Sequence, residues 1–519
     1  MDVKTRVTDL KPDSLPRPSR ASVWNRIRAR ATVDTRALAA LRILLGVTIL
    51  IDLAHRWGDI ELFYSDYGVY PVSAYETTYS RFTGLSMHAW SGEVWFQQLL
   101  FVIAALFAVA LILGYRTRLV AIVSLVFLIS LQARNPAVLN GGDRLFRVLL
   151  LLAILTPIGE RWSIDALRRG SARTQVAGFT TLALLAQPLA VFTANAVEKH
   201  EGDTWYHGEA LEIAMANDVM TVYLGNYLTE FPLLLEALTY GWVVLLSGSI
   251  VFLFLTAGRL RAFFALGYIS AFAGMATAMS VGLFPLVLTA SVLAYLTPPF
   301  WDALARRVPD RVAHYRPTAE VLGPLSKPLL EHRVLAYVRE NDYERAADFG
   351  VEYARSFVSI IGLFALVWIV LFTAADVTAY EVPDEIDNQH LNEQRWGLYA
   401  PNPSTAYSWY AVEAELAIGQ TVDPFDGGSV TADRPPDASQ EYANFRERKY
   451  LETVRNSGQG DSNGLIAVTY AEWACQAATD NLDGHADVES VTVNRFLQSS
   501  PLDGEYDDVR HLTVIEYEC

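Results

Sequence analysis

Long apolar runs separated by short polar connections fill the first three quarters of the chain. The runs reach about 17 to 25 residues, the length of helix that crosses the hydrocarbon core of a bilayer. This pattern predicts an all-α polytopic membrane bundle of about nine transmembrane helices, followed by a soluble α+β domain. The predicted spans lie near residues 38–55, 96–113, 119–131, 145–157, 176–197, 234–255, 262–279, 281–296 and 357–374.

The spans divide the sequence into five parts. These are a basic cytoplasmic segment (1–35), a transmembrane domain of eight spans (36–298), a cytoplasmic polar segment (299–355), the ninth helix (356–375) and an acidic extracytoplasmic domain (376–519). The orientation follows from arginine, which gathers in alternate connections, whereas residues 198–230 hold seven acids, one lysine and no arginine. We therefore expect a multi-pass cell-membrane protein with a cytoplasmic N-terminus and an extracytoplasmic C-terminus. No cleavable signal peptide is expected.

The last part of the sequence changes from long apolar runs to alternating patterns. Residues 405–418, 488–497 and 511–518 alternate as strands do, residues 464–478 favour a helix, and 419–440 favour a loop. From residue 376 onward there are 27 acidic and 8 basic residues. This balance argues against nucleic-acid binding and fits a salt-rich medium. Cys475 and Cys519 are the two cysteines, and both a disulfide and two free thiols stay open.

Two outer connections carry candidate chemistry. The first holds Asn140, Gly142, Asp143 and Arg144, which combine close backbone approach, oxygen acceptors and a fixed cation. The bland alternative is a capping turn, with Asp143 as the N-cap of the fourth span. Because both connections are expected on one side of the membrane, we expect their polar residues to share one outer pocket.

The second connection is the densest polar cluster of the transmembrane region, residues 195–210. Lys199 lies at an apolar boundary, where a lysine can lose its proton near neutral pH and act as a base. His200 can shuttle protons. The alternative is a snorkelling lysine beside interfacial aromatic residues such as Trp205.

Charges inside the spans are the remaining candidates. Arg42 and Arg147 each either pair within the bundle or contact a substrate or headgroup. The histidines are scattered at spacings that match no common metal site, so no metal is expected. No phosphate-binding glycine loop occurs either.

Several motifs together resemble one known family. NGGDRLFRVLLLLAILTPIGERWSID (140–165), AVEKHEGDTWYHGEAL (196–211) and SVGLFP (280–285) resemble the HTTM domain, the family of membrane proteins related to vitamin K-dependent gamma-carboxylase. RWGLYAPNP (395–403) and FRERKYL (445–451) resemble segments of the soluble domain of that family. The resemblance implies nine spans and an outward C-terminal domain.

The resemblance also implies a chemistry. In the carboxylase a lysine deprotonates a reduced quinone, the quinone is oxygenated to an epoxide, and the strong base produced removes a γ-proton from glutamate, which then adds carbon dioxide. Lys199 matches that lysine, and His200 stands beside it. A quinone or other isoprenoid lipid is the implied cofactor. Membrane lipid and an extracytoplasmic protein substrate are the implied partners. The implied pocket residues are Asn140, Gly142, Asp143, Arg144, Trp205 and Gly208.

The sequence departs from the carboxylase at two histidines. The first is replaced by the Asn140–Asp143 loop, and residues 262–283 contain no histidine where the second would stand. We therefore expect binding of a quinone-like lipid without carboxylation of glutamate. A non-catalytic or transport-like membrane protein and an outward-facing binding protein are the competing functions. The acidic bias also resembles proteins of salt-loving archaea.

Overall fold

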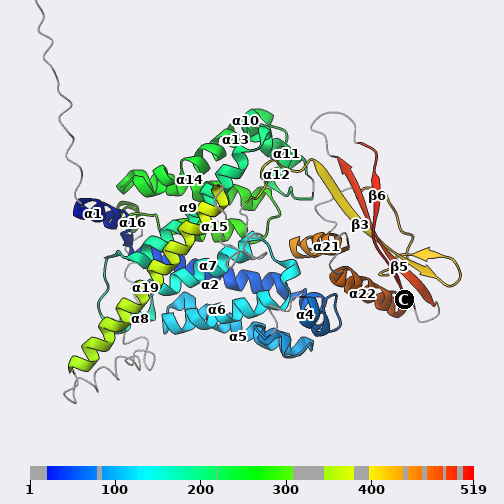
Figure 1. The fold of residues 1–519 in the computed structure, drawn as a ribbon, viewed down its shortest axis with the longest axis horizontal. Coiled ribbons are helices and arrows are strands. Elements are labelled where there is room, and N and C mark those ends of the chain that lie inside the picture. Colours follow the sequence, from blue (N-terminus) through cyan, green and yellow to red (C-terminus); the bar gives the residue numbers. More distant parts are fainter. Residues whose placement is uncertain are drawn as a thin grey trace, which may run out of the picture.

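The structure is a computed structural model that describes residues 20–78, 84–217, 219–307, 344–378, 397–435, 442–458, 464–482, 487–499 and 507–519. A helical bundle occupies one side of the molecule, and a sheet with two helices lies beside it (Figure 1). The predicted segments 1–35 and 299–355 fall partly outside the described residues.

The bundle is built from helices of very different lengths. The long ones supply the core and the short ones cap its ends (Figure 1). In chain order the helices are α1 (Arg20–Arg30), α2 (Thr35–Trp57), α3 (Ile60–Tyr64), α4 (Val72–Thr78), α5 (Val94–Leu113), α6 (Thr117–Arg134), α7 (Gly141–Leu155), α8 (Ile164–Arg169), α9 (Phe179–His200), α10 (Asp203–His207), α11 (Ala210–Ala216), α12 (Leu224–Leu228), α13 (Pro232–Ser247), α14 (Gly258–Ala278), α15 (Phe284–Leu293), α16 (Pro298–Ala305) and α19 (Glu344–Val377).

Six of the described helices are long and apolar enough to cross a membrane. They are α2, α5, α6, α9, α14 and the part of α19 from Glu352 to Val377. The pair α15 and α16, bent by 100°, would make a seventh if it forms one broken span. The predicted count of nine is therefore not confirmed. Helix α7 has only 15 residues, and the predicted sixth span divides into α13, of 16 residues, and a π-helix at Ile250–Leu255.

Apolar side chains cover both the inside and the outside of these helices. Leu41 and Leu45 of α2 are fully buried, whereas Leu106 of α5 and Phe364 of α19 are about two-thirds exposed. Helix α19 packs along α9 and presents most of its surface outward (Figure 1). An apolar outer surface of this kind is stable against lipid rather than water, so the described helices form a membrane protein.

The C-terminal domain is a four-stranded antiparallel sheet with two helices. The strand order is β4-β3-β5-β6, with β3 at Ala406–Leu416, β4 at Thr421–Val422, β5 at Val488–Ser499 and β6 at Arg510–Glu518. The predicted strands and the helix α22 (Leu465–Asn481) are confirmed. Two elements were not predicted, namely β4, inside the predicted loop, and the helix α21 (Phe445–Gly458).

A disulfide in the C-terminal domain and a short strand pair in the bundle each join distant residues of the chain. A disulfide joins Cys475 of α22 to Cys519, the last residue, which resolves the alternative between a disulfide and free thiols. In the bundle, strand β1 (Val33–Asp34) pairs with β2 (Gln175–Val176) and holds the start of α2 near the start of α9.

Candidate functional site

Lys199 lies in the last turn of α9 and is buried, with 2% of its surface exposed. Its Nζ donates to the carbonyl oxygens of Leu398 (2.6 Å) and Tyr399 (3.2 Å), which belong to the segment that leads into the C-terminal domain. Nζ also lies 3.7 Å from the centre of the Trp205 ring. The Trp205 Nε1 donates to the same Tyr399 carbonyl, at 3.1 Å. We call Lys199, Trp205, Leu398 and Tyr399 the lysine clamp.

The backbone of residues 397–402 is held against residues 198–204. Asn402 Oδ1 accepts from both the backbone nitrogen (3.1 Å) and the hydroxyl (2.8 Å) of Thr204. Gly202 lies so close to this segment that a Cβ there would be 1.9 Å from the Pro401 carbonyl oxygen. A side chain at position 202 would therefore push the segment away from Lys199.

Tyr399 has an unusual position in this segment. Its φ is +56°, in the left-handed region that few residues other than glycine adopt. In this conformation its carbonyl oxygen accepts from Lys199 Nζ and Trp205 Nε1. Its side chain packs against an apolar cluster that includes Met215, Met279 and Val281. Its hydroxyl is buried without a hydrogen-bond partner among the described residues. Burial raises the pKa of the Tyr399 phenol, so the hydroxyl is a neutral donor.

A second polar group lies where α21 meets the bundle. Asp52 and Arg56 of α2, Asp143 of α7 and Arg446 of α21 form a fully buried set of two carboxylates and two guanidinium groups, which we call the charge cluster. Arg446 Nη2 lies 2.6 Å from Asp52 Oδ1 and 3.1 Å from Asp143 Oδ1.

Helix α2 supplies the other cation of the charge cluster. Arg56 Nε lies 2.9 Å from Asp52 Oδ1, and Arg56 Nη2 lies 3.1 Å from Asp143 Oδ1. Arg56 also donates to the Tyr64 hydroxyl. The two formal charges of each sign balance, which is the condition under which buried ions are tolerated.

The loop before α7 orients Asp143. Asn140, rather than Asp143, is the N-cap, and its Oδ1 accepts from the backbone nitrogens of Gly142 and Asp143. Asp143 occupies the third helical position and accepts from the Asn140 backbone nitrogen, at 2.9 Å. The predicted N-cap was therefore wrong by three residues. The capping box leaves Asp143 able to bind both arginines, so the loop contributes a cap and a polar site together.

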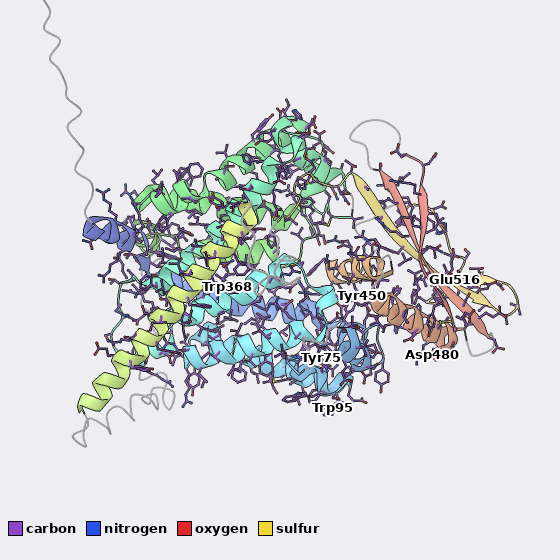
Figure 2. The ribbon with its side chains drawn as sticks, viewed as in Figure 1. Tyr75, Trp95, Trp368, Tyr450, Asp480 and Glu516 are labelled. Atoms are coloured by element: carbon purple, nitrogen blue, oxygen red, sulfur yellow. A yellow bond between two sulfur atoms is a disulfide. The ribbon has the colours of Figure 1, made fainter. Side chains whose placement is uncertain are left out.

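Helix α21 docks on one end of the bundle through more than Arg446. The Tyr450 hydroxyl donates to the Val69 carbonyl (2.8 Å), and Thr453 Oγ1 donates to the Ala137 carbonyl (2.9 Å). Tyr450 lies on the part of the C-terminal domain that is next to the bundle (Figure 2). Asn444 Nδ2 donates to Asp59 Oδ2, at 2.8 Å. The two parts of the molecule are thus joined by directed polar contacts.

The remaining predicted site residues have smaller roles in the geometry. His200 is exposed, and its Nδ1 lies 2.6 Å from the Ala196 carbonyl of its own helix. Arg144 is half-buried. A Cβ at Gly142 would be 2.9 Å from Phe284 Cα, and one at Gly208 would be 2.6 Å from Glu236 Cγ. Both glycines therefore allow close packing of neighbouring elements.

The residues expected to share one pocket fall into two sets of contacts. Lys199 and Trp205 belong to the lysine clamp, and Asp143 belongs to the charge cluster. The motif at 280–285 lies between the two sets, because Asn140 Nδ2 donates to the Val281 carbonyl (3.3 Å) and Val281 belongs to the apolar cluster under Tyr399. One shared pocket stays a prediction.

Arg42 bonds within the bundle, which was one of its two interpretations from the sequence. Its guanidinium donates to the backbone carbonyls of Ile112 (3.1 Å), Ile158 (3.2 Å) and Arg161 (3.2 Å), which lie at or beyond the ends of α5 and α7. It therefore ties helix ends together within the bundle. Within the described ranges no three His, Cys, Asp or Glu side chains gather as metal ligands would.

Sequence reasoning missed the roles of Arg56, Arg446 and Tyr399. Asp52, which interrupts an apolar run near the end of a predicted span, was the one available signal, because such a carboxylate needs a cationic partner. The FRERKYL motif contains that partner. It holds three basic residues, and the sequence does not indicate that Arg446 is the one that meets Asp52.

Comparison with known proteins gives one result. The family model of the HTTM domain matches residues 30–301, more than half of the chain. Searches of curated proteins and of solved structures found no match. The matched region contains Lys199, Trp205 and three of the four members of the charge cluster, whereas Arg446, Leu398 and Tyr399 lie beyond it. The chain belongs to the HTTM domain family, which is the family found in vitamin K-dependent gamma-carboxylase.

Proposed function

We propose that this protein is a membrane enzyme that acts at the outer face on a quinone-like isoprenoid lipid, with Lys199 as the base. The observation that carries the proposal is the lysine clamp. Nζ of Lys199 is buried, and no ion pair of Lys199 occurs among the described residues. Lysines in such surroundings serve as general bases and nucleophiles in enzymes.

The partners of Nζ suit both protonation states. A neutral amine donates two hydrogens to the carbonyls of Leu398 and Tyr399 and keeps its lone pair to accept a proton. After proton transfer the ammonium directs its third hydrogen to the face of Trp205, where a cation is attracted by the ring. The site therefore stabilises the ammonium that proton abstraction produces. Because the ring occupies the direction of the lone pair, one contact of Nζ has to open before a hydroxyl can reach it.

The residues near the clamp suit a hydroxylated aromatic ring with an apolar tail. A hydroquinone, when bound, would supply an acidic hydroxyl and reducing electrons. The buried Tyr399 hydroxyl offers a neutral donor for the ligand, and Met215, Met279 and Val281 offer an apolar wall. Pockets for such ligands combine apolar walls with a few convergent polar groups. The two missing histidines argue against carboxylation of glutamate, because its γ-proton is only very weakly acidic.

Replacing Lys199 by arginine tests the proposal most sharply. An arginine can donate to the same two carbonyls and stack on Trp205, but it stays protonated and cannot act as a base. We expect Lys199→Arg to fold normally and to lose hydroquinone-dependent oxygen consumption by at least 100-fold, as removal of a general base does. Lys449→Ala is the matched control, since Lys449 pairs with Glu452 in α21.

The competing function of Lys199 is structural, and its hydrogen bonds to the carbonyl oxygens of Leu398 and Tyr399 favour this alternative. In that case Lys199 only fastens the segment 397–402 to α9. Lys199→Arg would then retain any oxygen consumption of the wild type, and the catalytic proposal would fall. Lys199→Ala gives the complementary result, because loss of folding in this variant together with retained activity in the arginine variant identifies a structural lysine. Incorporation of labelled carbon dioxide into a glutamate peptide would overturn the argument from the missing histidines.

A further inference from the structure

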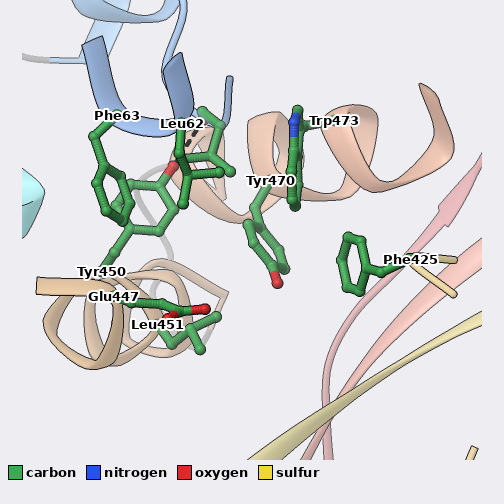
Figure 3. A pocket seen from close by; sticks show the side chains of 9 residues that line it. Leu62, Phe63, Phe425, Glu447, Tyr450, Leu451, Tyr470 and Trp473 are labelled. Carbon is green, nitrogen blue, oxygen red and sulfur yellow. Dashed lines mark hydrogen bonds between the residues drawn. The ribbon is translucent and has the colours of Figure 1, made fainter. Parts of the chain in front are cut away.

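A cavity of about 150 Å³ lies between the bundle and the C-terminal domain, and its lining shares no residue with the lysine clamp. It opens where α3 meets α21 and α22 (Figure 3). Nine residues from four segments line it, namely Leu62, Phe63, Val69, Phe425, Glu447, Tyr450, Leu451, Tyr470 and Trp473.

Aromatic rings form most of the wall. The rings of Phe425 and Trp473 lie 5.2 Å apart between centres, and those of Tyr470 and Trp473 lie 5.7 Å apart. On the other side Phe63 and Tyr450 are separated by 5.5 Å. In Figure 3 the Tyr470 ring stands between Phe425 on one side and Leu451 and Glu447 on the other. Aromatic rings carry negative charge on their faces, so a wall of this composition attracts cations.

The one charged side chain of the lining is also negative. Glu447 contributes a carboxylate, and none of the nine lining residues is lysine, arginine or histidine. Asp423 adds a second carboxylate beside the lining, because its Oδ1 accepts from the Phe425 backbone nitrogen, at 2.7 Å. The pKa of the Tyr470 phenol is raised by burial and further by Glu447 and Asp423. The C-terminal domain as a whole is strongly acidic. A positively charged guest is therefore favoured over a neutral or anionic one.

Two hydrogen-bonding groups of the wall, those of Glu447 and Tyr450, have protein partners. Glu447 Oε2 accepts from the Ala443 backbone nitrogen, at 2.7 Å, and the Tyr450 hydroxyl donates to the Val69 carbonyl, at 2.8 Å. A primary ammonium needs three acceptors, whereas a quaternary ammonium needs none. The volume also suits one compact group, because a cavity of this size holds a molecule as large as benzene.

We propose that this cavity is a binding site for a quaternary ammonium group, held by the rings of Phe425, Tyr470 and Trp473 and by the charge of Glu447. The same group occurs in soluble solutes such as choline and in phosphocholine lipid headgroups. The site is independent of Lys199 and of any quinone.

Binding of tetramethylammonium to the purified full chain in a maltoside detergent tests the proposal. Fluorescence of a protein with twelve tryptophans is unspecific, so isothermal titration is the primary measurement. We expect saturable binding of tetramethylammonium and choline, and at least tenfold weaker binding of 3,3-dimethylbutan-1-ol, the uncharged isostere of choline. Equal binding of the uncharged isostere would overturn the proposal, because the cavity would then be a simple apolar site.

Two variants locate the binding. Glu447→Gln keeps the hydrogen bond to Ala443 but removes the charge, and Trp473→Leu removes an aromatic face. We expect each to weaken tetramethylammonium about tenfold. Glu472→Gln, on the same helix as Trp473 but paired with the Tyr517 hydroxyl, is the matched control. Unchanged affinity in both cavity variants, or an equal loss in the control, would contradict the assignment.

The source of the group is decided by lipid exchange. In nanodiscs of phosphatidylglycerol the cavity is open to soluble tetramethylammonium, whereas in nanodiscs of phosphatidylcholine a headgroup ligand would compete with it. A loss of tetramethylammonium binding that occurs in phosphatidylcholine alone identifies the headgroup. Equal binding in both lipids identifies a soluble solute. Absence of binding in detergent and in both lipids would refute the site.

Discussion

Arg446 and Asp52 are 394 residues apart in the sequence, yet their Nη2 and Oδ1 atoms lie 2.6 Å apart. One belongs to a helix of the C-terminal domain and the other to the first long helix of the bundle. Both side chains are fully buried. The contact means that the two parts of this protein share one interior.

Removing Arg446 should separate these parts. Arg446→Met leaves Asp52 and Asp143 buried with Arg56 as the remaining cation of the charge cluster, and breaking a buried pair in this way costs about 3–5 kcal/mol. We expect a lower Tm and faster proteolysis of the segment before α21. Arg455→Met, in the same helix but bonded to its neighbour Asn456, is the control.

A second change should restore part of that loss. Asp143→Asn combined with Arg446→Met removes one charge of each sign, so the buried set is again neutral. A double-mutant cycle should therefore show a coupling of about 1–3 kcal/mol between the two positions. Additive effects would mean that Arg446 stabilises the interface by packing alone.

Gly202→Ala should open the lysine clamp. The new Cβ would lie 1.9 Å from the Pro401 carbonyl oxygen, so the backbone of the segment 397–402 has to move. We expect a loss of about 1–3 kcal/mol and faster reaction of Lys199 with an amine-specific reagent. Gly241→Ala, in α13 with nothing within 4 Å of its Cβ, should be neutral or slightly stabilising. Unchanged labelling of Lys199 in Gly202→Ala would contradict the described path of the segment.

The Cys475–Cys519 disulfide should stabilise the sheet. It closes a loop of 44 residues, for which the chain-entropy estimate is about 4 kcal/mol. We expect a reductant to lower the Tm of the wild type and to leave Cys519→Ser unchanged. Alkylation of two thiols in the native, unreduced protein would show that the bond is absent.

The stability of the C-terminal domain should fall in acid through Glu452. Burial raises the pKa of Glu452, but the nearby charges of Lys449 and Arg448 lower it by more. The pKa of Glu452 therefore lies below its ordinary value of about 4.5. A lowered pKa means that this carboxylate stabilises the folded state above about pH 4.5, and that the contribution fades as the pH falls through the folded value. The Tm difference between wild type and Glu452→Gln should therefore shrink between pH 6 and pH 3. A constant difference would exclude an ionic origin.

The sequence predicted the long helices and most of the sheet because hydropathy and alternation are local patterns. Helix α21 was missed, since its charged residues face both solvent and the bundle and therefore conceal its apolar stripe. The charge cluster was missed for another reason. Its members come from three distant helices, and only the fold decides which arginine meets Asp52. The N-cap at Asn140 was confused with Asp143 because both residues accept hydrogen bonds equally well.

Lys199 was a candidate from the sequence, but its acceptors were not predicted. Its motif marks a lysine at the end of an apolar helix, whereas its acceptors are the main-chain oxygens of Leu398 and Tyr399. Every residue has such an oxygen, so no pattern of side chains can announce them.

The same fact decides how the site responds to mutation. A substitution at position 398 changes a side chain and leaves the acceptor of Lys199 in place. The acceptor is lost only when the chain takes another path, as when Tyr399 leaves its left-handed conformation. The amine therefore responds to the position of the C-terminal domain rather than to the chemical identity of its neighbours. Any movement of that domain relative to the bundle would change how strongly the amine holds its proton.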